Sequence, residues 1–326
     1  MKQSLFLTFP EVLMMSRFSS FVLALLLLVA SGQVMAAGTC TSGGAGDLDG
    51  TEDGVPWAAE ATNGTGCSMT TGTIAAPDST NVLSIGHVIA VPTAATISVS
   101  SVAFTAGSLT LTGKTLNVGT TLNAAGGTVT IGTSGTLNVT GNVTVGTDGT
   151  IDMTGGILSI GVALNNTAGT LTTGTGTLKL TNADHAITVA AGKTFAVVDA
   201  SLLTGATGSG KLITFAGAFD NTISSLTLPA AAGIEIKFVV PEVKKLTISA
   251  TTGGTVLNCT AAVTGGTTPI APTVTGTSAA PILTASTTAS TTSTFTCATA
   301  ITVVNNISAP IFSTKEKAAV FGQEVK

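Results

Sequence analysis

The residues best suited to chemistry lie in an acidic stretch near the N-terminus. The sequence GDLDGTEDG places carboxylates at Asp47, Asp49, Glu52 and Asp53. Alternating carboxylates on a glycine-containing loop suit Ca²⁺, which takes six to eight oxygen ligands from flexible segments. The spacing departs from the standard helix–loop–helix calcium loop, because Gly50 comes too early and no Glu stands at the twelfth position, so a solvated acidic loop is the competing interpretation. Ca²⁺ is therefore the only cofactor that the sequence suggests, and none is required.

The cysteines form two local groups that predict disulfides. The chain has 4 Cys, and pairing within each group joins Cys40 to Cys67 and Cys259 to Cys297. Such bonds persist in oxidising compartments and would each stabilise the fold by about 3 kcal/mol. A metal site is the alternative, but the chain lacks a CxxC pair and has only 2 His, which argues against it.

Other polar residues offer little catalytic chemistry. Asp184 and His185 stand side by side in TNADHA and could form an acid/base pair, but adjacent Asp and His in a turn are more often solvated surface. His87 is interpreted as a structural hydrogen-bonding residue. Trp57 could stack on a sugar, but we expect it to plug the apolar end of the fold. We assign no catalytic residue and expect no enzyme.

The elements that position these residues belong to a repeat. From about Val82 to Val198 the chain reads as short strands such as KTLNVG, GTVTIG and GTLNVT, with apolar residues at alternate positions and glycine at the ends. Alternation puts the apolar side chains on one face of a strand and Thr or Asn on the other. The pattern therefore predicts stacked strands of a solenoid.

Three columns of predicted inward residues set the period. They are Leu109, Val129, Ile151 and Leu171; Leu116, Leu137, Ile157 and Leu178; and Leu122, Val143, Leu164 and Ile187. The steps lie between 20 and 23 residues, which predicts coils of about 21 residues with three strands each. The sequence therefore predicts an all-β fold, a parallel β-helix (β-solenoid). The crossover rule favours a right-handed coil. Three sides are preferred over a two-sided coil of about 14 residues.

A short motif precedes the repeats. It consists of a proline, an acidic residue, spaced apolar residues and a Gly-His pair: Pro77, Asp78, Val82, Ile85, Gly86, His87, Val88 and Val91. With Trp57 upstream, it resembles the entry to β-solenoid domains of bacterial secreted and cell-surface proteins, over roughly residues 57 to 200, although Asp78 follows the proline directly. The coils also resemble haemagglutinin-type adhesin repeats. The resemblance implies an architecture and a location at the cell surface.

The chain divides into five expected parts. Residues 1–36 read as a bacterial-type secretory signal peptide, with Lys2 and Arg17, the apolar run FVLALLLLVA, and the cleavage pattern Val34-Met35-Ala36. A head with the acidic loop follows (37–81), then the β-solenoid (82–199). Residues 200–262 are expected to form irregular coils or a β cap, with IEIKFVV and KKLTISA as an antiparallel pair. Residues 263–326 hold a Thr/Ser/Pro-rich segment and a small disulfide-stapled β module with a charged tail.

Composition limits the function. With 12 Lys plus Arg against 16 Asp plus Glu, the chain lacks the basic surface that nucleic-acid binding needs. We expect no membrane span in the mature form. The sequence predicts a secreted, non-catalytic structural or adhesive rod that self-assembles into a filament, sheath or surface layer, or that binds a cell-surface or extracellular polymer. The alternative is a carbohydrate-binding or carbohydrate-cleaving β-helix, which the single Trp and absent Tyr disfavour.

Overall fold

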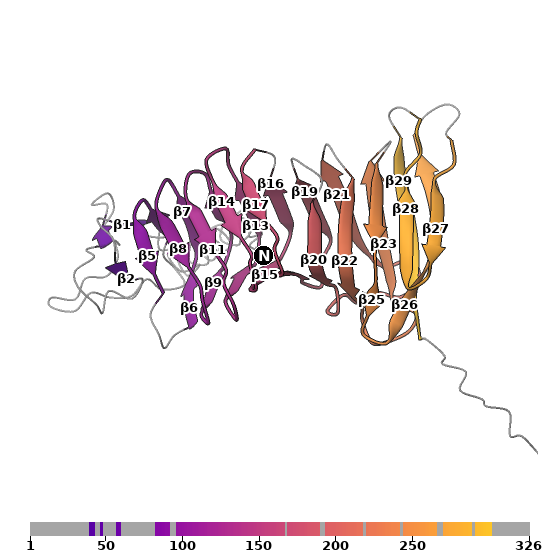
Figure 1. Cartoon of the computed structure of the whole chain (residues 1–326), viewed down its shortest axis with the longest axis horizontal. Coiled ribbons are helices and arrows are strands. Elements are labelled where there is room, and N and C mark those ends of the chain that lie inside the picture. The colour runs from indigo at the N-terminus through magenta and orange to yellow at the C-terminus, as the bar shows by residue number, and fades with distance from the viewer. Residues whose placement is uncertain are drawn as a thin grey trace, which may run out of the picture.

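The chain folds into a rod of stacked β-coils (Figure 1). The computed structural model describes residues 39–42, 46–47, 57–59, 82–91, 96–166, 168–189, 193–217, 220–241, 244–265, 270–288 and 291–301. Every element within these ranges is a β-strand, and none of them is a helix. The predicted all-β parallel solenoid is thus confirmed.

The strands form three sheets that run along the rod. The 6-stranded sheet contains β2 (Gly46–Asp47), β5 (Val88–Ala90), β8 (Ser108–Thr110), β11 (Thr128–Thr130), β14 (Thr150–Asp152) and β17 (Thr170–Thr172). The 11-stranded sheet contains β6 (Thr96–Val99), β9 (Thr115–Val118), β12 (Thr136–Val139), β15 (Ile157–Ile160), β18 (Thr177–Leu180), β20 (Thr194–Asp199), β22 (Asn221–Thr227), β24 (Lys245–Ile248), β25 (Thr251–Thr252), β27 (Thr273–Thr277) and β28 (Ala280–Thr284).

The 12-stranded sheet contains β1 (Thr39–Ser42), β3 (Trp57–Ala59), β4 (Val82–Ile85), β7 (Ser101–Phe104), β10 (Leu122–Ala124), β13 (Asn142–Val145), β16 (Ala163–Asn166), β19 (His185–Val189), β21 (Lys211–Gly217), β23 (Glu235–Pro241), β26 (Thr255–Thr264) and β29 (Thr292–Ile301). Its parallel strands, like those of the other two sheets, come from successive coils.

The core is built from columns of apolar side chains in register. In the 6-stranded sheet, Leu109 pairs with Val129, Val129 with Ile151 and Ile151 with Leu171, and all are buried. No single coil could bury this face alone, but stacked coils share one continuous core. The predicted first column is therefore confirmed, and the third column is confirmed in the same way.

The predicted second column is wrong at one position. Leu137 pairs with Leu158 and not with Ile157, which lies on the outer, half-buried side of β15. The sequence GILSI offers three apolar residues, and register with Leu137 and Val139 selects Leu158 and Ile160 for the core. Because side chains alternate between faces, a one-residue shift moves a residue from the core to the surface.

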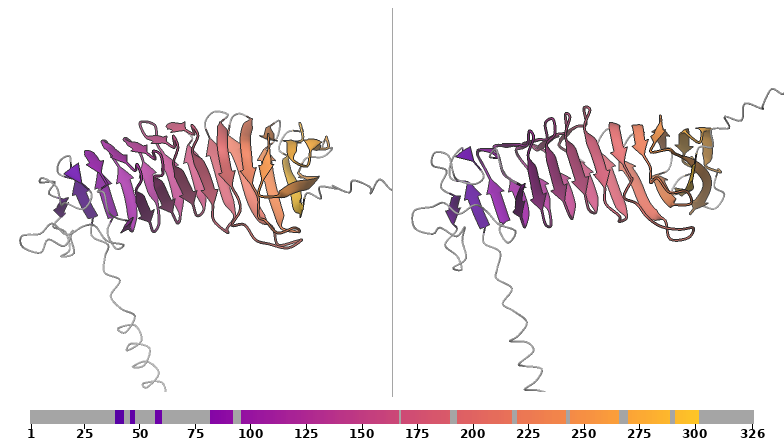
Figure 2. Two further views of the ribbon diagram at one scale, coloured as in Figure 1. Left: turned by 60° about the horizontal axis from the view of Figure 1, so that its bottom comes forward. Right: turned by 90° about the horizontal axis from the view of Figure 1, so that it is seen from below.

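The rod changes from three sides to two along its length (Figure 2). Within the described chain, the 6-stranded sheet ends at β17, whereas the other two sheets continue. Val197 pairs with Ser225, a step of 28 residues, and strands lengthen to 7 residues in β21 to β23. Here Phe195 of β20 meets Phe215 of β21 edge to face with ring centroids 6.4 Å apart, so larger side chains join the two sheets directly.

The strand direction reverses at the C-terminal end. β29 pairs antiparallel with both β23 and β26, and β28 pairs antiparallel with both β24 and β27. The predicted pairing of IEIKFVV with KKLTISA is wrong, because β23 and β24 lie in different sheets and each continues the parallel stack of its own sheet. Residues 200–262 thus supply both the last parallel strands and one strand of the antiparallel end.

Candidate functional site

The proposed calcium ligands are largely outside the described residues. Asp47 ends β2, whose backbone pairs in parallel with β5 at Ala90, while Asp49, Glu52 and Asp53 lie outside the described ranges. Among the residues that the structure describes, no group of three His, Cys, Asp or Glu side chains comes together. Calcium binding by the acidic loop stays a prediction.

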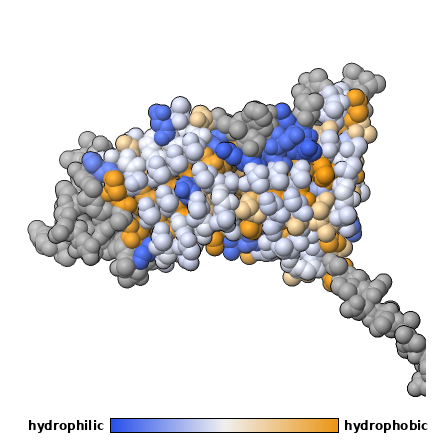
Figure 3. All heavy atoms as spheres, in the orientation of Figure 1, coloured by the Kyte–Doolittle hydropathy of each residue, from blue (hydrophilic) through white to orange (hydrophobic). Residues whose placement is uncertain are grey.

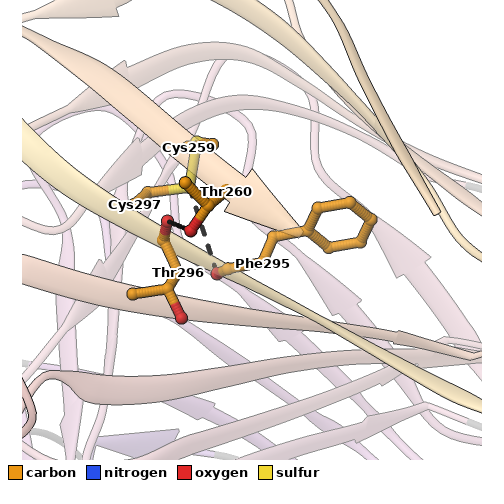
Figure 4. Close-up of a disulfide and its surroundings, with 5 residues drawn as sticks. All are labelled: Cys259, Thr260, Phe295, Thr296 and Cys297. Carbon is orange, nitrogen blue, oxygen red and sulfur yellow. Dashed lines mark hydrogen bonds between the residues drawn. A yellow bond between two sulfur atoms is a disulfide. The ribbon is translucent and has the colours of Figure 1, made fainter. Parts of the chain in front are cut away.

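The C-terminal disulfide forms as predicted (Figure 4). Cys259 of β26 and Cys297 of β29 are directly opposite each other in the antiparallel ladder, and their sulfur atoms are 2.08 Å apart. Cys297 is fully buried beside the inward ring of Phe295, whereas Cys259 is partly buried. Cys40 of β1 is also fully buried, and its predicted partner Cys67 lies outside the described residues.

The adjacent Asp184 and His185 serve different parts of the structure. His185 points into the core at the start of β19, with Nε2 2.8 Å from the Thr181 carbonyl oxygen. Burial lowers the pKa of His185. Hydrogen bonds to backbone groups and the negative charge of Asp184 raise the pKa, but they offset the effect of burial only in part. The Asp184 carboxylate instead accepts a hydrogen bond from the Leu212 N–H at 2.8 Å. The two side chains are therefore structural, and they do not form an acid/base pair.

A Ser-His contact that the sequence analysis missed lies near the N-terminal end. His87 Nδ1 is 3.1 Å from Ser42 Oγ, and the same hydroxyl accepts a hydrogen bond from the Gly86 N–H at 2.8 Å. Ser42 is only 3% exposed. A nucleophile needs access to its substrate, so this contact fits a bridge that ties β1 to the corner before β5. No sequence signal joins the two residues, because they are 45 positions apart.

Most carboxylates of the rod accept hydrogen bonds from backbone groups. Asp152 accepts a hydrogen bond from Thr154 N–H, Asp199 from Ser201 N–H and Asp220 from Lys245 N–H. Glu235 accepts one from Gly208 N–H at 3.0 Å and pairs with Lys237 at 3.2 Å. The hydrogen bond from the Gly208 N–H lowers the pKa of Glu235 most, and Lys237 lowers it further. Together they outweigh desolvation, which raises the pKa. These acids thus hold turns and loops in place.

The most regular surface is the outer side of the 6-stranded sheet, which we call the threonine face. Its two columns, from four successive strands, hold Ser108 and Thr110, Thr128 and Thr130, Thr150 and Asp152, and Thr170 and Thr172. These side chains are half-buried or exposed, whereas the residue between each pair is buried. Hydroxyl groups therefore stand on a rigid apolar support.

The outer face of the 11-stranded sheet is different. Asn138 Nδ2 donates to Asn117 Oδ1 at 2.8 Å, and Asn117 Nδ2 donates to Ser98 Oγ at 3.2 Å. These side chains satisfy one another along the rod. Farther along the same face, Ile157 and Lys179 interrupt the column pattern. This surface is less uniform than the threonine face.

Comparison with known proteins found no match, so the function is argued from the residues of this chain. No protein-family model, no curated protein and no solved structure matches the chain. The resemblance to bacterial β-solenoid and adhesin repeats consequently remains a prediction. The described residues also contain no helix that is long and apolar enough to span a membrane.

Proposed function

We propose that the protein is a secreted, non-catalytic β-solenoid rod that serves as a structural or adhesive component outside the cell. It acts by presenting flat polar faces to copies of itself or to a cell-surface or extracellular polymer. The observation that carries this proposal is the threonine face, where eight outward positions from four coils repeat in register. A repeated surface suits a repeated partner, because each coil can make the same contact.

The roles of the carboxylates support a non-catalytic function. Cleavage of a glycosidic bond uses two carboxyl groups that flank the bond. Asp152, Asp184 and Asp199 accept hydrogen bonds from backbone N–H groups in separate turns. Each of these side chains already has a structural task, which favours the rod over the carbohydrate-cleaving alternative.

Two features support export. The N-terminal residues 1–36 have the pattern of a signal peptide. The Cys259–Cys297 disulfide closes the C-terminal end, and such bonds persist mainly in oxidising compartments. We infer that the rod works beyond the cytoplasm.

The C-terminal end favours contacts through the sides of the rod. β27 is an exposed edge strand, but Pro272 precedes it and Gly276 within it has a φ of 82°. Proline and irregular backbone are devices that discourage further strands from adding to an edge. Addition of a further strand at β27 is therefore disfavoured, which supports lateral contact through the faces.

Surface localisation tests the proposal. The full chain, expressed in the producing organism, is expected to be reached by antibody and protease on intact cells, with Cys259 and Cys297 oxidised. A variant without residues 1–36 should stay inside the cell. Recovery of the full chain in the cytoplasm with reduced cysteines, or release of sugars from polysaccharide by the purified protein, would contradict the proposal.

A further inference from the structure

The spacing of the threonine face is fixed by the backbone. Thr128 N–H donates to the Gly107 carbonyl at 3.0 Å, Thr150 to Gly127 at 2.7 Å and Thr170 to Gly149 at 2.9 Å. Neighbouring strands are consequently about 4.8 Å apart, and the two columns on one strand are about 6.6 Å apart. The face is a rectangular array with these two repeats.

The glycines before these strands keep the array tight. A Cβ atom at Gly149 would lie 1.7 Å from the Ala124 carbonyl oxygen, and one at Gly169 would lie 2.1 Å from the Gly146 carbonyl oxygen. The coils therefore approach each other as closely as the backbone allows. Behind the array, Val129 and Ile151 are fully buried, so the support has little freedom to move.

The hydroxyl groups of the array are unused within the protein. In the described part of the chain, no hydrogen bond involves the side chain of Ser108, Thr110, Thr128, Thr130, Thr150, Thr170 or Thr172. The one carboxylate, Asp152, turns to the Thr154 N–H and hydroxyl. Each threonine thus offers a free donor and acceptor next to a methyl group, and the array carries little charge.

These properties restrict the ligand. An array with a single carboxylate, Asp152, and no aromatic rings offers no stacking platform for sugars and little charge for a mineral or a nucleic acid. It matches a rigid, uncharged lattice whose every point can both donate and accept a hydrogen bond. The oxygen atoms on the prism faces of hexagonal ice form such a lattice, with one repeat close to the strand spacing and the other somewhat longer than the column spacing.

We propose that the threonine face binds ice. This inference rests on the proposed function, because it names the extracellular solid that one face of the rod contacts. Waters held by the hydroxyls and methyl groups adopt the repeat of the array and join the crystal lattice. A bound rod then forces the ice front to curve between protein molecules, which slows growth and recrystallisation.

Partition into growing ice tests the inference. The purified full-length protein should concentrate in a slowly grown ice hemisphere and inhibit recrystallisation of a sucrose-ice suspension. The double variant Thr130→Lys/Thr150→Lys, at the centre of the face, should lose at least tenfold in both assays. The matched control Thr136→Lys/Thr144→Lys changes outward threonines on the two other sheets and should retain both activities.

A milder pair of variants guards against misfolding. Thr130→Val/Thr150→Val keeps the shape but removes the hydroxyls, and Thr130→Ser/Thr150→Ser keeps the hydroxyls but removes the methyl groups. Both should fold with an unchanged melting temperature to within a few degrees and lose part of the ice activity. Exclusion of the wild-type protein from ice, or equal loss in the control variant, overturns the inference.

Binding to an insoluble polysaccharide separates this inference from the proposed function. In one outcome, the wild-type protein is excluded from ice but sediments with cellulose or chitin, and the variant Thr130→Lys/Thr150→Lys no longer sediments. That outcome would overturn ice binding and leave the adhesive rod intact. A chain that is retained in the cytoplasm would instead overturn the proposed function, whatever its behaviour in ice.

Discussion

Ser134 occupies a backbone position that suits glycine. Its φ is 58°, and the equivalent corners of the neighbouring coils hold Gly113 (φ 67°) and Gly155 (φ 83°). A side chain in this conformation costs about 1–2 kcal/mol, partly offset because glycine adds freedom to the unfolded chain. Ser134→Gly should therefore raise the free energy of unfolding by about 0.5–1 kcal/mol, measured by urea titration. Gly155→Ser, the matched reverse change, should lower it; an opposite order would contradict this account of the corners.

His185 should make stability depend on pH. Burial lowers its pKa from 6.5, so the unfolded chain binds the proton more tightly than the folded chain. The stabilisation that the buried, neutral His185 gives to the folded state is complete above pH 6.5. It is lost as the pH falls toward the folded-state pKa. Between pH 7 and pH 5 the wild type should lose stability, and His185→Leu should flatten this dependence in urea titrations at each pH. Equal slopes in wild type and His185→Leu would refute the prediction.

At the scale of the coil, the glycine corners hold the strands at their spacing. Gly149→Ala places a Cβ atom 1.7 Å from the Ala124 carbonyl oxygen, so the two coils must separate. The expected loss of stability is about 3 kcal/mol or more. Gly119→Ala is a suitable control, because its nearest neighbours would be 3.5 Å away. Thermal melts of the two variants that coincide would show that the corners tolerate side chains.

The disulfide should stabilise the antiparallel end. It joins residues 38 positions apart and encloses the β27–β28 hairpin, so its loss frees a large loop in the unfolded chain. Cys259→Ala/Cys297→Ala is expected to lower the free energy of unfolding by about 4 kcal/mol. Amide exchange should accelerate most in β26, the edge strand. Unchanged exchange in β26 would mean that the ladder with β29 suffices alone.

Local periodicity predicted the elements well where the pattern repeats. Columns such as Leu109, Val129 and Ile151 were predictable because each coil must bury the same face. The shift at Ile157 could have been predicted, because Leu158 and Ile160 alternate with Ser159, whereas a register with Ile157 inward would turn Ser159 inward as well. The placement of β23 and β24 in different sheets could not be predicted. Alternation shows that one face of a strand is solvated, but it does not show which other strand pairs with it.

The site was less predictable than the fold. The threonines of the face appear in the sequence only as the polar half of a strand pattern, and their common sheet depends on how coils stack. The Ser42–His87 contact spans 45 residues and carries no local signal. The buried state of His185 follows from strands that lengthen where the rod becomes two-sided, which the regular repeat before it does not reveal.

At the scale of the whole molecule, charge and polarity are unevenly placed. The space-filling view shows pale, near-neutral surface over much of the N-terminal half, while hydrophilic residues gather over the C-terminal half (Figure 3). By sequence, the C-terminal half holds the charged residues Lys193, Lys211, Asp220 and Lys245, and the side chains of Asp220 and Lys245 are 3.9 Å apart. The threonine face, with Asp152 as its one charged residue, thus lies on the three-sided part of the rod, away from most of the charge.

The central claim is that this rod works by lateral contact outside the cell. Negative-stain electron microscopy of the purified secreted protein, alone and with extracellular polymer from the producing organism, tests it most directly, with and without Ca²⁺. We expect rods that associate side by side into sheets or fibres, or that coat the polymer along their length. A dependence on Ca²⁺ would assign Asp47, Asp49, Glu52 and Asp53 as ligands. Isolated rods that bind neither one another nor the polymer under both conditions would contradict the claim.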